Sequence, residues 1–174
     1  MSFGSKFERQ AFKPLCGSSL RKPSNDDEMV AELEQKLKTL QLYHDAALAD
    51  SVVRYGNEGV LEKVAEQKRA EQMKSGAGLA ARFGITEPKQ AIEKTRDTYG
   101  CADWVCTDTS NGFEAVATRC SLCAISKQMG QFNPCNIYCL SPIEAMIIGV
   151  APEAEFSTLS TLWDSDNCRL CVKL

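Results

Sequence analysis

The stretch from Arg119 to Cys139 carries the residue types best suited to chemistry in this chain. Its sequence, RCSLCAISKQMGQFNPCNIYC, holds cysteines at positions 120, 123, 135 and 139. Thiolates are nucleophiles and metal ligands, whereas an unreactive cysteine behaves as a small apolar residue. Three uses are therefore open for this cluster: metal binding, nucleophilic catalysis, and burial of small side chains.

Two Cys-x-x-Cys pairs have the spacing of zinc or iron–sulfur sites: Cys120 with Cys123, and Cys168 with Cys171. The second pair lies in CRLCVKL, which has the composition of a strand. Residues three apart on a strand point to opposite faces, so Cys168 and Cys171 are not expected to share an ion. We expect no metal and no cofactor, and a thiol-based metal-binding or metabolite-binding protein stays open as an alternative.

Three cysteines are better candidates for reactive thiols. Asn133 and Pro134 are typical of a helix start, which places Cys135 in the first turn, where the helix dipole favours a thiolate. Cys139 lies one turn further on and is expected to share the same face. Cys120 lies at the end of a predicted strand, a common place for functional residues.

The residues before this cluster predict helices. Residues 1–25 mix Gly, Ser, Pro and charge, which predicts an extended arm. From residue 26, apolar residues recur at three- and four-residue steps typical of an amphipathic helix: Met29, Leu33, Leu37, Leu40 and Tyr43. The glycines of RYGNEGVL predict a break in the next helical pattern, and a further helix from Thr86 is expected to stop at Gly100.

Two hairpins follow. Residues 104–109 and 112–118 flank Asn-Gly, a strong hairpin signal, and residues 156–163 and 168–174 flank a second turn. The order predicts an α+β fold, with N-terminal helices packed on a four-stranded antiparallel sheet made of two hairpins. Residues 26–174 are expected to form a single domain, with a helical layer over 26–100 and a cysteine-rich sheet with helices over 101–174.

Composition restricts the partners. Lys and Arg number 20 and Asp and Glu 23, so the net charge is -3, which argues against nucleic acid or an anionic membrane surface. Charges interrupt the apolar runs near the N-terminus, so no export signal is expected, and no run approaches the about 20 apolar residues of a membrane span. We expect a cytoplasmic protein that binds a small molecule, and a homodimer stays open.

Other residue types offer further candidates for a site. Trp104 could form one wall of a pocket, although core packing is its commoner role. The single histidine, His44, is more typical of a helix end than of a catalytic base. Carboxylates that could carry a proton are Asp103, Glu114, Glu144, Asp164 and Asp166. Glycine-rich phosphate loops and the GxSxG and HExxH patterns do not occur, so nucleotide cofactors are not indicated.

Residues 50–174 resemble the L-2-amino-thiazoline-4-carboxylic acid hydrolase family. The resemblance depends on RYGNEGVL, GLAARFGI, Trp104, the hairpin ending in RCSLC, the CNIYC pair, and WDSDNCRLCVKL. Members of that family usually have Cys-Pro at the hairpin end, a cysteine or cysteine pair further on, and Gly-Asp shortly before a final cysteine. Here Ser121 stands in place of the proline, and Asp164-Ser165 in place of Gly-Asp.

The resemblance implies an enzyme that hydrolyses a C–N bond of a cyclic amidine of the thiazoline type, giving an N-carbamoyl amino acid. Its site cysteines, carried over, are Cys120, Cys135 or Cys139, and Cys168. A thiolate would attack the C=N carbon, Asp164 or Glu114 would carry the proton, and Arg119 would bind a substrate carboxylate. An isomerase, cyclase or dehydratase acting on a small reactive metabolite of a biosynthetic pathway is the alternative.

Overall fold

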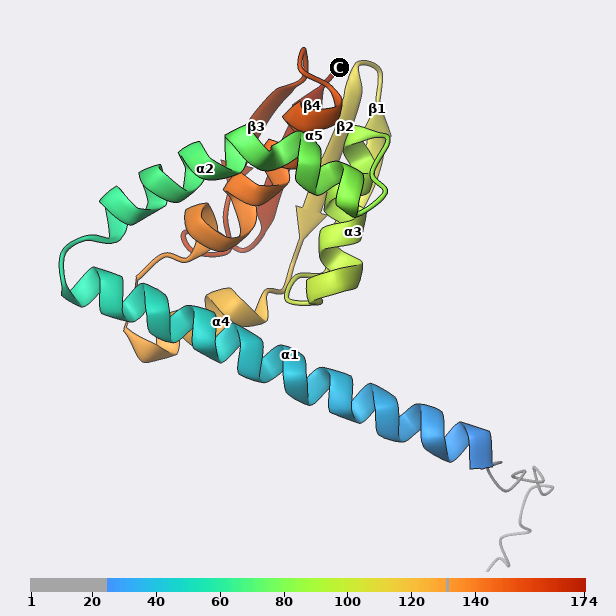
Figure 1. Cartoon of the computed structure of the whole chain (residues 1–174), viewed down its shortest axis with the longest axis vertical. Helices are drawn as coiled ribbons and strands as arrows, with labels where there is room; N and C mark the ends of the chain where they lie inside the picture. Colours follow the sequence, from blue (N-terminus) through green and yellow to red (C-terminus); the bar gives the residue numbers. More distant parts are fainter. Residues whose placement is uncertain (1–24, 131) are drawn as a thin grey trace, which may run out of the picture.

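The computed structural model of the protein describes residues 25–130 and 132–174, so the predicted arm lies outside the described residues except for Asn25. The elements run in the order α1 (Asn25–Asn57), α2 (Leu61–Arg82), α3 (Pro88–Tyr99), β1 (Val105–Thr109), β2 (Gly112–Ala117), α4 (Ser121–Met129), a π-helix (Asn136–Leu140), α5 (Ser141–Val150), β3 (Glu155–Ser160) and β4 (Cys168–Lys173) (Figure 1). The fold is α+β, as predicted.

The four strands form one antiparallel sheet with the order β1-β2-β4-β3, so the two predicted hairpins lie side by side. The central strands β2 and β4 pair along their whole length, from Gly112 with Lys173 to Ala117 with Cys168. Alternate residues of β4 face the core: Cys168 is buried, whereas Cys171 lies on the opposite face and is only half-buried. This confirms the prediction that Cys168 and Cys171 point apart.

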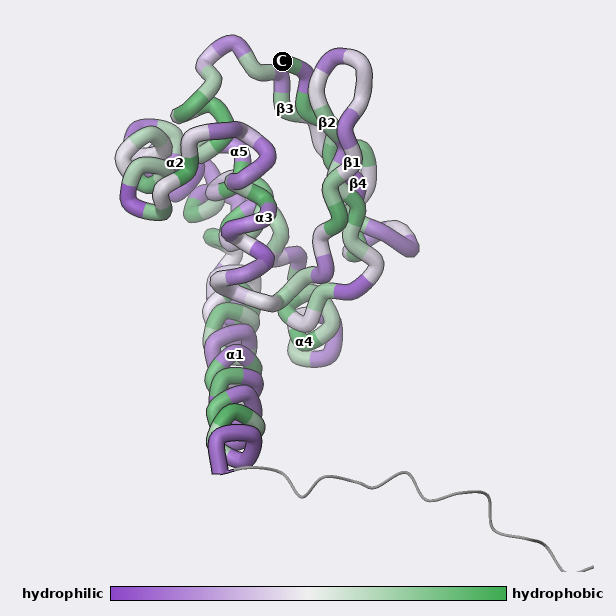
Figure 2. The backbone as a smooth tube through the Cα atoms, turned by 90° about the vertical axis from the view of Figure 1, so that its right-hand side faces the viewer, coloured by the Kyte–Doolittle hydropathy of each residue, from purple (hydrophilic) through white to green (hydrophobic). Residues whose placement is uncertain are grey.

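Helices α2, α3 and α5 cover one face of the sheet, while α1 and α4 lie together beyond its end (Figures 1 and 2). The core between the layers is built from large apolar side chains, among them Ile92, Ile143, Ile147, Phe113, Leu170 and Val172. Each such side chain contributes about 1.5–3 kcal/mol when it is fully buried. Trp104 belongs to this core, is only 1% exposed, and lines none of the pockets described below.

Two glycines allow α2 and α5 to cross closely. A side chain at Gly76 would overlap the carbonyl group of Ala145, and one at Gly149 would overlap the backbone of Ala77. Elsewhere glycine ends helices, as predicted: Gly100 adopts a left-handed conformation after α3, with φ 65°. Likewise, α1 and α2 are separated at residues 58–60, within RYGNEGVL.

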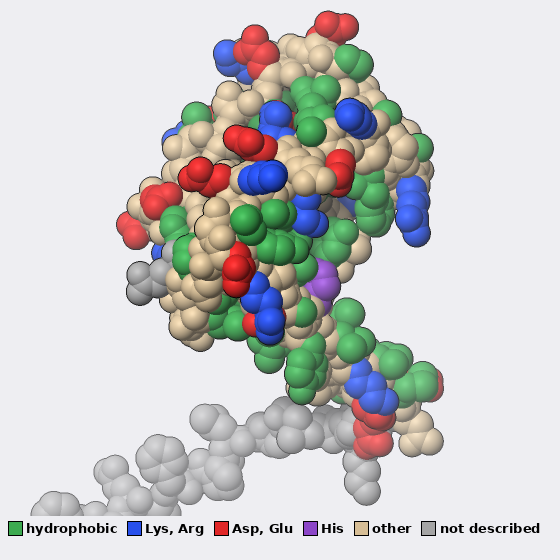
Figure 3. Space-filling view, turned by 60° about the vertical axis from the view of Figure 1, so that its left-hand side comes forward, with side chains coloured by type: hydrophobic (Ala, Val, Ile, Leu, Met, Phe, Trp, Pro, Cys, Tyr) green, Lys and Arg blue, Asp and Glu red, His purple; other side chains and the backbone are tan. Residues whose placement is uncertain are grey.

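Helix α1 is amphipathic, but only its second half is packed. Asp45, Ala49 and Val52 are buried, and this part of the helix contacts α4. The first half extends away from the other described elements (Figure 1), and the space-filling view shows hydrophobic side chains on its surface (Figure 3). More than half of each of these side chains is exposed: Met29, Val30, Leu33, Leu37, Leu40 and Tyr43. No described helix is long and apolar enough to cross a membrane.

Candidate functional site

Cys120 occupies the N-cap of α4, a helix that the sequence analysis did not predict. Its backbone is extended, with φ −151° and ψ 114°, and its Sγ accepts a hydrogen bond from the backbone N–H of Cys123 at 3.4 Å. Side-chain oxygens usually fill this position because they accept the free N–H groups of the first turn. Here a sulfur atom does so, next to the positive end of a helix dipole.

Cys101, between α3 and β1, lies beside Cys120. Ala102 pairs with Cys120 in an isolated antiparallel bridge, and the Ser121 N–H donates to the Cys101 carbonyl oxygen at 2.8 Å. The Cys101 thiol hydrogen-bonds to the Cys120 sulfur, and this bond, helped by the Cys123 N–H, lowers the pKa of Cys120 against the opposing effect of burial. The same hydrogen bond, together with burial, raises the pKa of Cys101. Cys120 is therefore the favoured thiolate of the pair and Cys101 the proton carrier.

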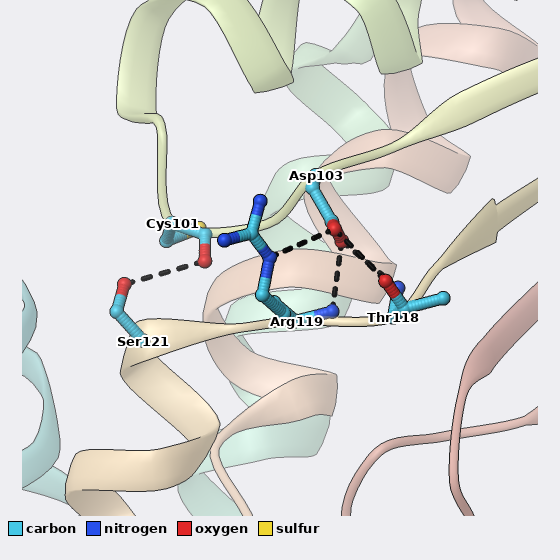
Figure 4. A network of polar contacts seen from close by, with 5 residues as sticks. All are labelled: Cys101, Asp103, Thr118, Arg119 and Ser121. Atoms are coloured by element: carbon cyan, nitrogen blue, oxygen red, sulfur yellow. Dashed lines mark hydrogen bonds and ion pairs between the residues drawn. The ribbon is translucent and has the colours of Figure 1, made fainter. Parts of the chain in front are cut away.

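Asp103 fixes the turn that leads from β2 to Cys120 (Figure 4). Its carboxylate accepts the backbone N–H groups of Thr118 and Arg119, each at 2.8 Å, the Thr118 hydroxyl at 2.9 Å, and Nε of Arg119 at 3.2 Å. Burial raises the pKa of Asp103, but the hydrogen bonds from Arg119 and Thr118 outweigh it and lower this pKa to about 2. Asp103 is therefore ionised at neutral pH and positions the residues that precede Cys120.

A groove of about 750 Å³ passes along Cys120, Cys101 and Cys123. The groove is also lined by three cationic side chains, those of Arg96, Arg119 and Lys127. Only one carboxylate, that of Asp103, is among its lining residues. The Arg119 side chain is 85% exposed, and its terminal nitrogens have no partner among the described residues. The groove therefore offers a nucleophilic sulfur and a positive charge to a small anionic molecule.

Cys123 and Cys135 form a second pair of neighbouring thiols. The Cys135 N–H donates to Oδ1 of Asn133 at 2.8 Å, and the helical conformation begins at Cys135, as the sequence predicts. A hydrogen bond from the Cys135 thiol is the main cause that lowers the pKa of Cys123, to about 7. That bond and burial raise the pKa of Cys135. In this pair the thiolate is favoured on Cys123, whereas the sequence suggested a thiolate on Cys135, which is buried.

Cys139 and Cys168 lie near the groove but do not line it. Cys139 and Cys101 line a separate cavity between the helices. Burial raises the pKa of Cys139. Cys168 starts β4, where burial raises its pKa against the opposing hydrogen bond from the Leu162 N–H at 3.1 Å. Both side chains are therefore neutral thiols at physiological pH. Of the four predicted site cysteines, Cys120 lines the groove and Cys139 lines the cavity, whereas Cys135 and Cys168 line neither.

Two of the predicted proton carriers, Glu114 and Asp164, do not line the groove, whereas Asp103 does. Glu114 lies on the outward face of β2 and forms an ion pair with Arg169 of β4, with 2.9 Å between Oε2 and the nearest guanidinium nitrogen. Asp164 is exposed in the turn before β4, and its charge opposes the lowering of the pKa of Cys123. Glu114 therefore faces away from the groove, and Asp164 lies near Cys123 without lining the groove.

Two residues of these sites were missed in the sequence analysis. Cys101 follows the stop of α3 at Gly100, and only the tertiary fold brings it to Cys120. Asp45 is 1% exposed, on the same face of α1 as Ala49 and Val52. Its spacing of four and seven residues from these small apolar positions was an available signal of burial.

The eight described cysteines are free thiols. Among residues 25–130 and 132–174, no three His, Cys, Asp or Glu side chains are grouped so that they could hold a metal ion. The cysteines near α4 instead form two pairs of neighbouring thiols, in each of which the pKa of one thiol is lowered by its partner.

No protein-family description, curated protein or solved structure matches this chain. The family resemblance therefore stays a prediction from the residues quoted for it. The chemistry of the groove has to be inferred from its own side chains: Cys120 with its proton donor Cys101, and the cationic Arg119 and Lys127.

Proposed function

We propose that this chain is a thiol-dependent hydrolase that opens a cyclic amidine of the thiazoline type, with Cys120 as its nucleophile. The observation that carries this proposal is the position of Cys120 at the N-cap of α4, on the wall of a groove lined by cationic side chains. A thiolate is the reactive form of cysteine, and a helix N-terminus favours that form. Thiolates attack electron-poor carbon atoms such as the C=N carbon of an amidine.

Arg119 and Lys127 support a substrate that carries a carboxylate. The terminal nitrogens of Arg119 can bind both oxygens of a carboxylate, in the paired geometry that guanidinium groups favour. Lys127 Nζ already donates to the Leu162 carbonyl at 2.8 Å, which holds its charge beside the groove. An ammonium group has three donors, so this contact leaves others for a substrate.

Cys101 is the proton carrier of this proposal. The Cys120 thiolate adds to the C=N carbon, the bond from that carbon to the ring sulfur breaks, and the ring sulfur takes the proton of Cys101. This leaves an isothiourea on Cys120 and a free thiol on the substrate. Water then attacks the same carbon and its two protons go to the former ring nitrogen and to Cys101, while Cys120 leaves as a thiolate. The product is an N-carbamoyl amino acid, one water heavier than the substrate.

Incubation with 2-amino-thiazoline-4-carboxylate tests this function. Mass spectrometry is expected to show the gain of one water, together with one new thiol per product molecule. Cys120→Ser is expected to lower turnover by at least about 1,000-fold, because the nucleophile is lost. Cys171→Ser is the matched control, since Cys171 lies on the outward face of β4 and lines neither the groove nor the cavity.

Three results would contradict the hydrolase. A product of unchanged mass would favour an isomerase or cyclase instead. Full turnover in Cys120→Ser would exclude Cys120 as the nucleophile. Absence of turnover in the natural chain, with the substrate bound in the groove, would favour a metabolite-binding protein.

A further inference from the structure

A second cavity, of about 180 Å³, lies between α1, α2, α3 and the π-helix. A cavity of about 150 Å³ is large enough for a benzene ring, so this one can hold a small organic molecule. Most of its wall is apolar or aromatic, with Leu48, Leu79, Phe83, Tyr99 and Tyr138 among the lining residues. Two polar side chains in this wall each have a buried oxygen atom without a hydrogen-bond partner.

Asp45 is the first of them. Its Oδ2 accepts a hydrogen bond from the Ser121 hydroxyl, whereas Oδ1 is buried and has no hydrogen-bond donor among the described residues. The nearest cationic candidate is Nδ1 of His44 at 3.5 Å, and the His44 side chain is 46% exposed. A buried carboxylate costs several kcal/mol unless an opposite charge or further donors compensate it. An unsatisfied carboxylate oxygen at a cavity wall therefore calls for a donor from outside the chain.

Gln72 is the second polar residue of the cavity wall that has an unsatisfied hydrogen-bonding atom. Its Nε2 donates to the Ile137 carbonyl oxygen at 3.3 Å, which fixes the orientation of the amide. Its Oε1 is buried without a hydrogen-bond partner. The unsatisfied atoms of Asp45 and Gln72 are thus both acceptors. Thr95, a third polar residue in the wall, already donates its hydroxyl to the Ala91 carbonyl at 2.7 Å.

The charge of the wall favours a cation. Lys94, the one lysine of the lining, is exposed, so water solvates its charge. The carboxylate of Asp45 is buried, so its charge acts on the cavity with little screening. The face of an aromatic ring is negative and attracts cations. Lys68 Nζ already lies 5.3 Å from the centroid of the Tyr138 ring, and His44 stacks on Tyr99 with 5.8 Å between the ring centroids.

We propose that this cavity binds a small amidinium or guanidinium ion, with Asp45 and Gln72 as its acceptors. Such an ion is planar, carries one positive charge, and has N–H groups that can donate to two separate oxygens. The thiazoline carboxylate proposed for the groove would bring a negative charge towards Asp45, so the cavity is a separate site. The inference does not depend on the proposed hydrolase, because it is tested by binding and not by turnover.

The test uses the full chain with benzamidine and acetamidine, and with the neutral amides benzamide and acetamide as isosteric comparators. Calorimetry and thermal unfolding are expected to show at least about ten-fold tighter binding of an amidine than of its amide. Asp45→Asn removes the charge and keeps an acceptor for Ser121, so it is expected to weaken amidine binding at least about ten-fold. Asp50→Asn is the matched control on α1, since Asp50 pairs with Arg54 outside the cavity, and it is expected to bind as the natural chain does.

A second variant keeps the test decisive if Asp45→Asn does not fold. Gln72→Met removes the acceptor at similar length and is expected to weaken amidine binding at least about three-fold. The proposal is overturned if neither amidine binds more tightly than its amide. It is also overturned if Asp45→Asn folds and binds an amidine as tightly as the natural chain does. If only Gln72→Met folds, the same result for that variant overturns the proposal.

Discussion

The two Cys-x-x-Cys pairs of this chain have identical spacing and opposite geometry. Cys120 and Cys123 lie at the N-terminus of α4, where the backbone N–H of Cys123 reaches the Cys120 sulfur at 3.4 Å. Cys168 and Cys171 lie on β4, where the first is buried and the second belongs to the other face. The first pair meets at a helix end, whereas the second is separated by the sheet itself.

The difference shows that the surroundings of a thiol pair, and not its spacing, decide whether a thiolate is favoured, because the Cys101 and Cys135 side chains also lower the pKa values of Cys120 and Cys123. At the start of α4, free N–H groups and the helix dipole lower the energy of a thiolate. Within β4, the backbone N–H groups are used by the neighbouring strands, and burial raises the pKa of Cys168. Identical spacing therefore gives one pair at a helix N-terminus, where a thiolate is favoured, and one pair on opposite faces of a strand.

The largest expected effect concerns the alkylation rates of Cys120 and Cys168. With limiting iodoacetamide at pH 7, Cys120 is expected to react at least about ten-fold faster, because each unit of pKa changes the thiolate fraction about ten-fold below the pKa. The pKa of Cys120 is lowered and that of Cys168 is raised. Mass spectrometry of the labelled peptides measures both rates in one sample.

The pH dependence gives the control for this comparison. The Cys120 rate is expected to fall as the pH drops through its pKa, below the model-compound value of 9.0, whereas the Cys168 rate is expected to stay low up to more alkaline pH. Equal rates for the two cysteines at pH 7, after unfolded protein is removed, would show that the helix end does not activate Cys120.

A smaller effect is expected from Asp103→Asn, which weakens the turn before Cys120. Asp103 accepts bonds from Thr118 and Arg119, and bonds to a charged group contribute about 1.5–3 kcal/mol. We expect a loss of about 2 kcal/mol in the free energy of unfolding at pH 7, measured with urea, and slower alkylation of Cys120.

The same variant has a defined pH dependence. The folded-state pKa of Asp103 is about 2, below the value of about 3.9 for an unfolded chain. Its contribution is therefore complete above about pH 4 and is lost as the pH falls towards 2. A loss in Asp103→Asn that is the same at pH 2 and pH 7 would contradict this role. Asp108→Asn is the control, because Asp108 pairs with Lys89 at a side chain that is 74% exposed.

The smallest effect is expected from Glu114→Gln, on the outward face that Cys171 shares. This variant breaks the ion pair with Arg169, and such surface pairs contribute about 0.2–1 kcal/mol. We expect a loss of about 0.5 kcal/mol in the free energy of unfolding by urea denaturation, and an unchanged alkylation rate of Cys120. A slower Cys120 reaction in this variant would mean that the two faces of the sheet are coupled.

Most of the fold could be predicted from local signals. The Asn-Gly turn, the left-handed Gly100 and the break before α2 are set by residues next to each other in the chain. Helix α4 was missed because cysteine is an unusual N-cap, although Gly130 at its end and the buried positions Leu122, Cys123 and Ser126 fit a helical period. Apolar periodicity also predicted α1, but it could not show that half of the helix extends away from the core.

The candidate site was only partly predictable. Cys120 and Arg119 were identified because both end the same hairpin, and they do line one groove. Cys101 and Asp45 were not identified as site residues, because only contacts between distant parts of the chain bring Cys101 to the groove and Asp45 to the cavity. Cys139 and Cys168 were assigned to the same pocket as Cys120, although spacing cannot show which side of a wall a side chain faces.

Cys101 lines both the groove and the cavity, so a ligand in the cavity that moves the Cys101 thiol would couple the two sites. A ligand that draws the Cys101 thiol into the cavity removes the hydrogen bond that favours the Cys120 thiolate, and so weakens the acidity of Cys120. Reciprocity then requires that ionisation of Cys120 weakens that ligand by the same factor. Under both proposals, a ligand bound in the cavity would change the reactivity of Cys120 through the Cys101 sulfur atom.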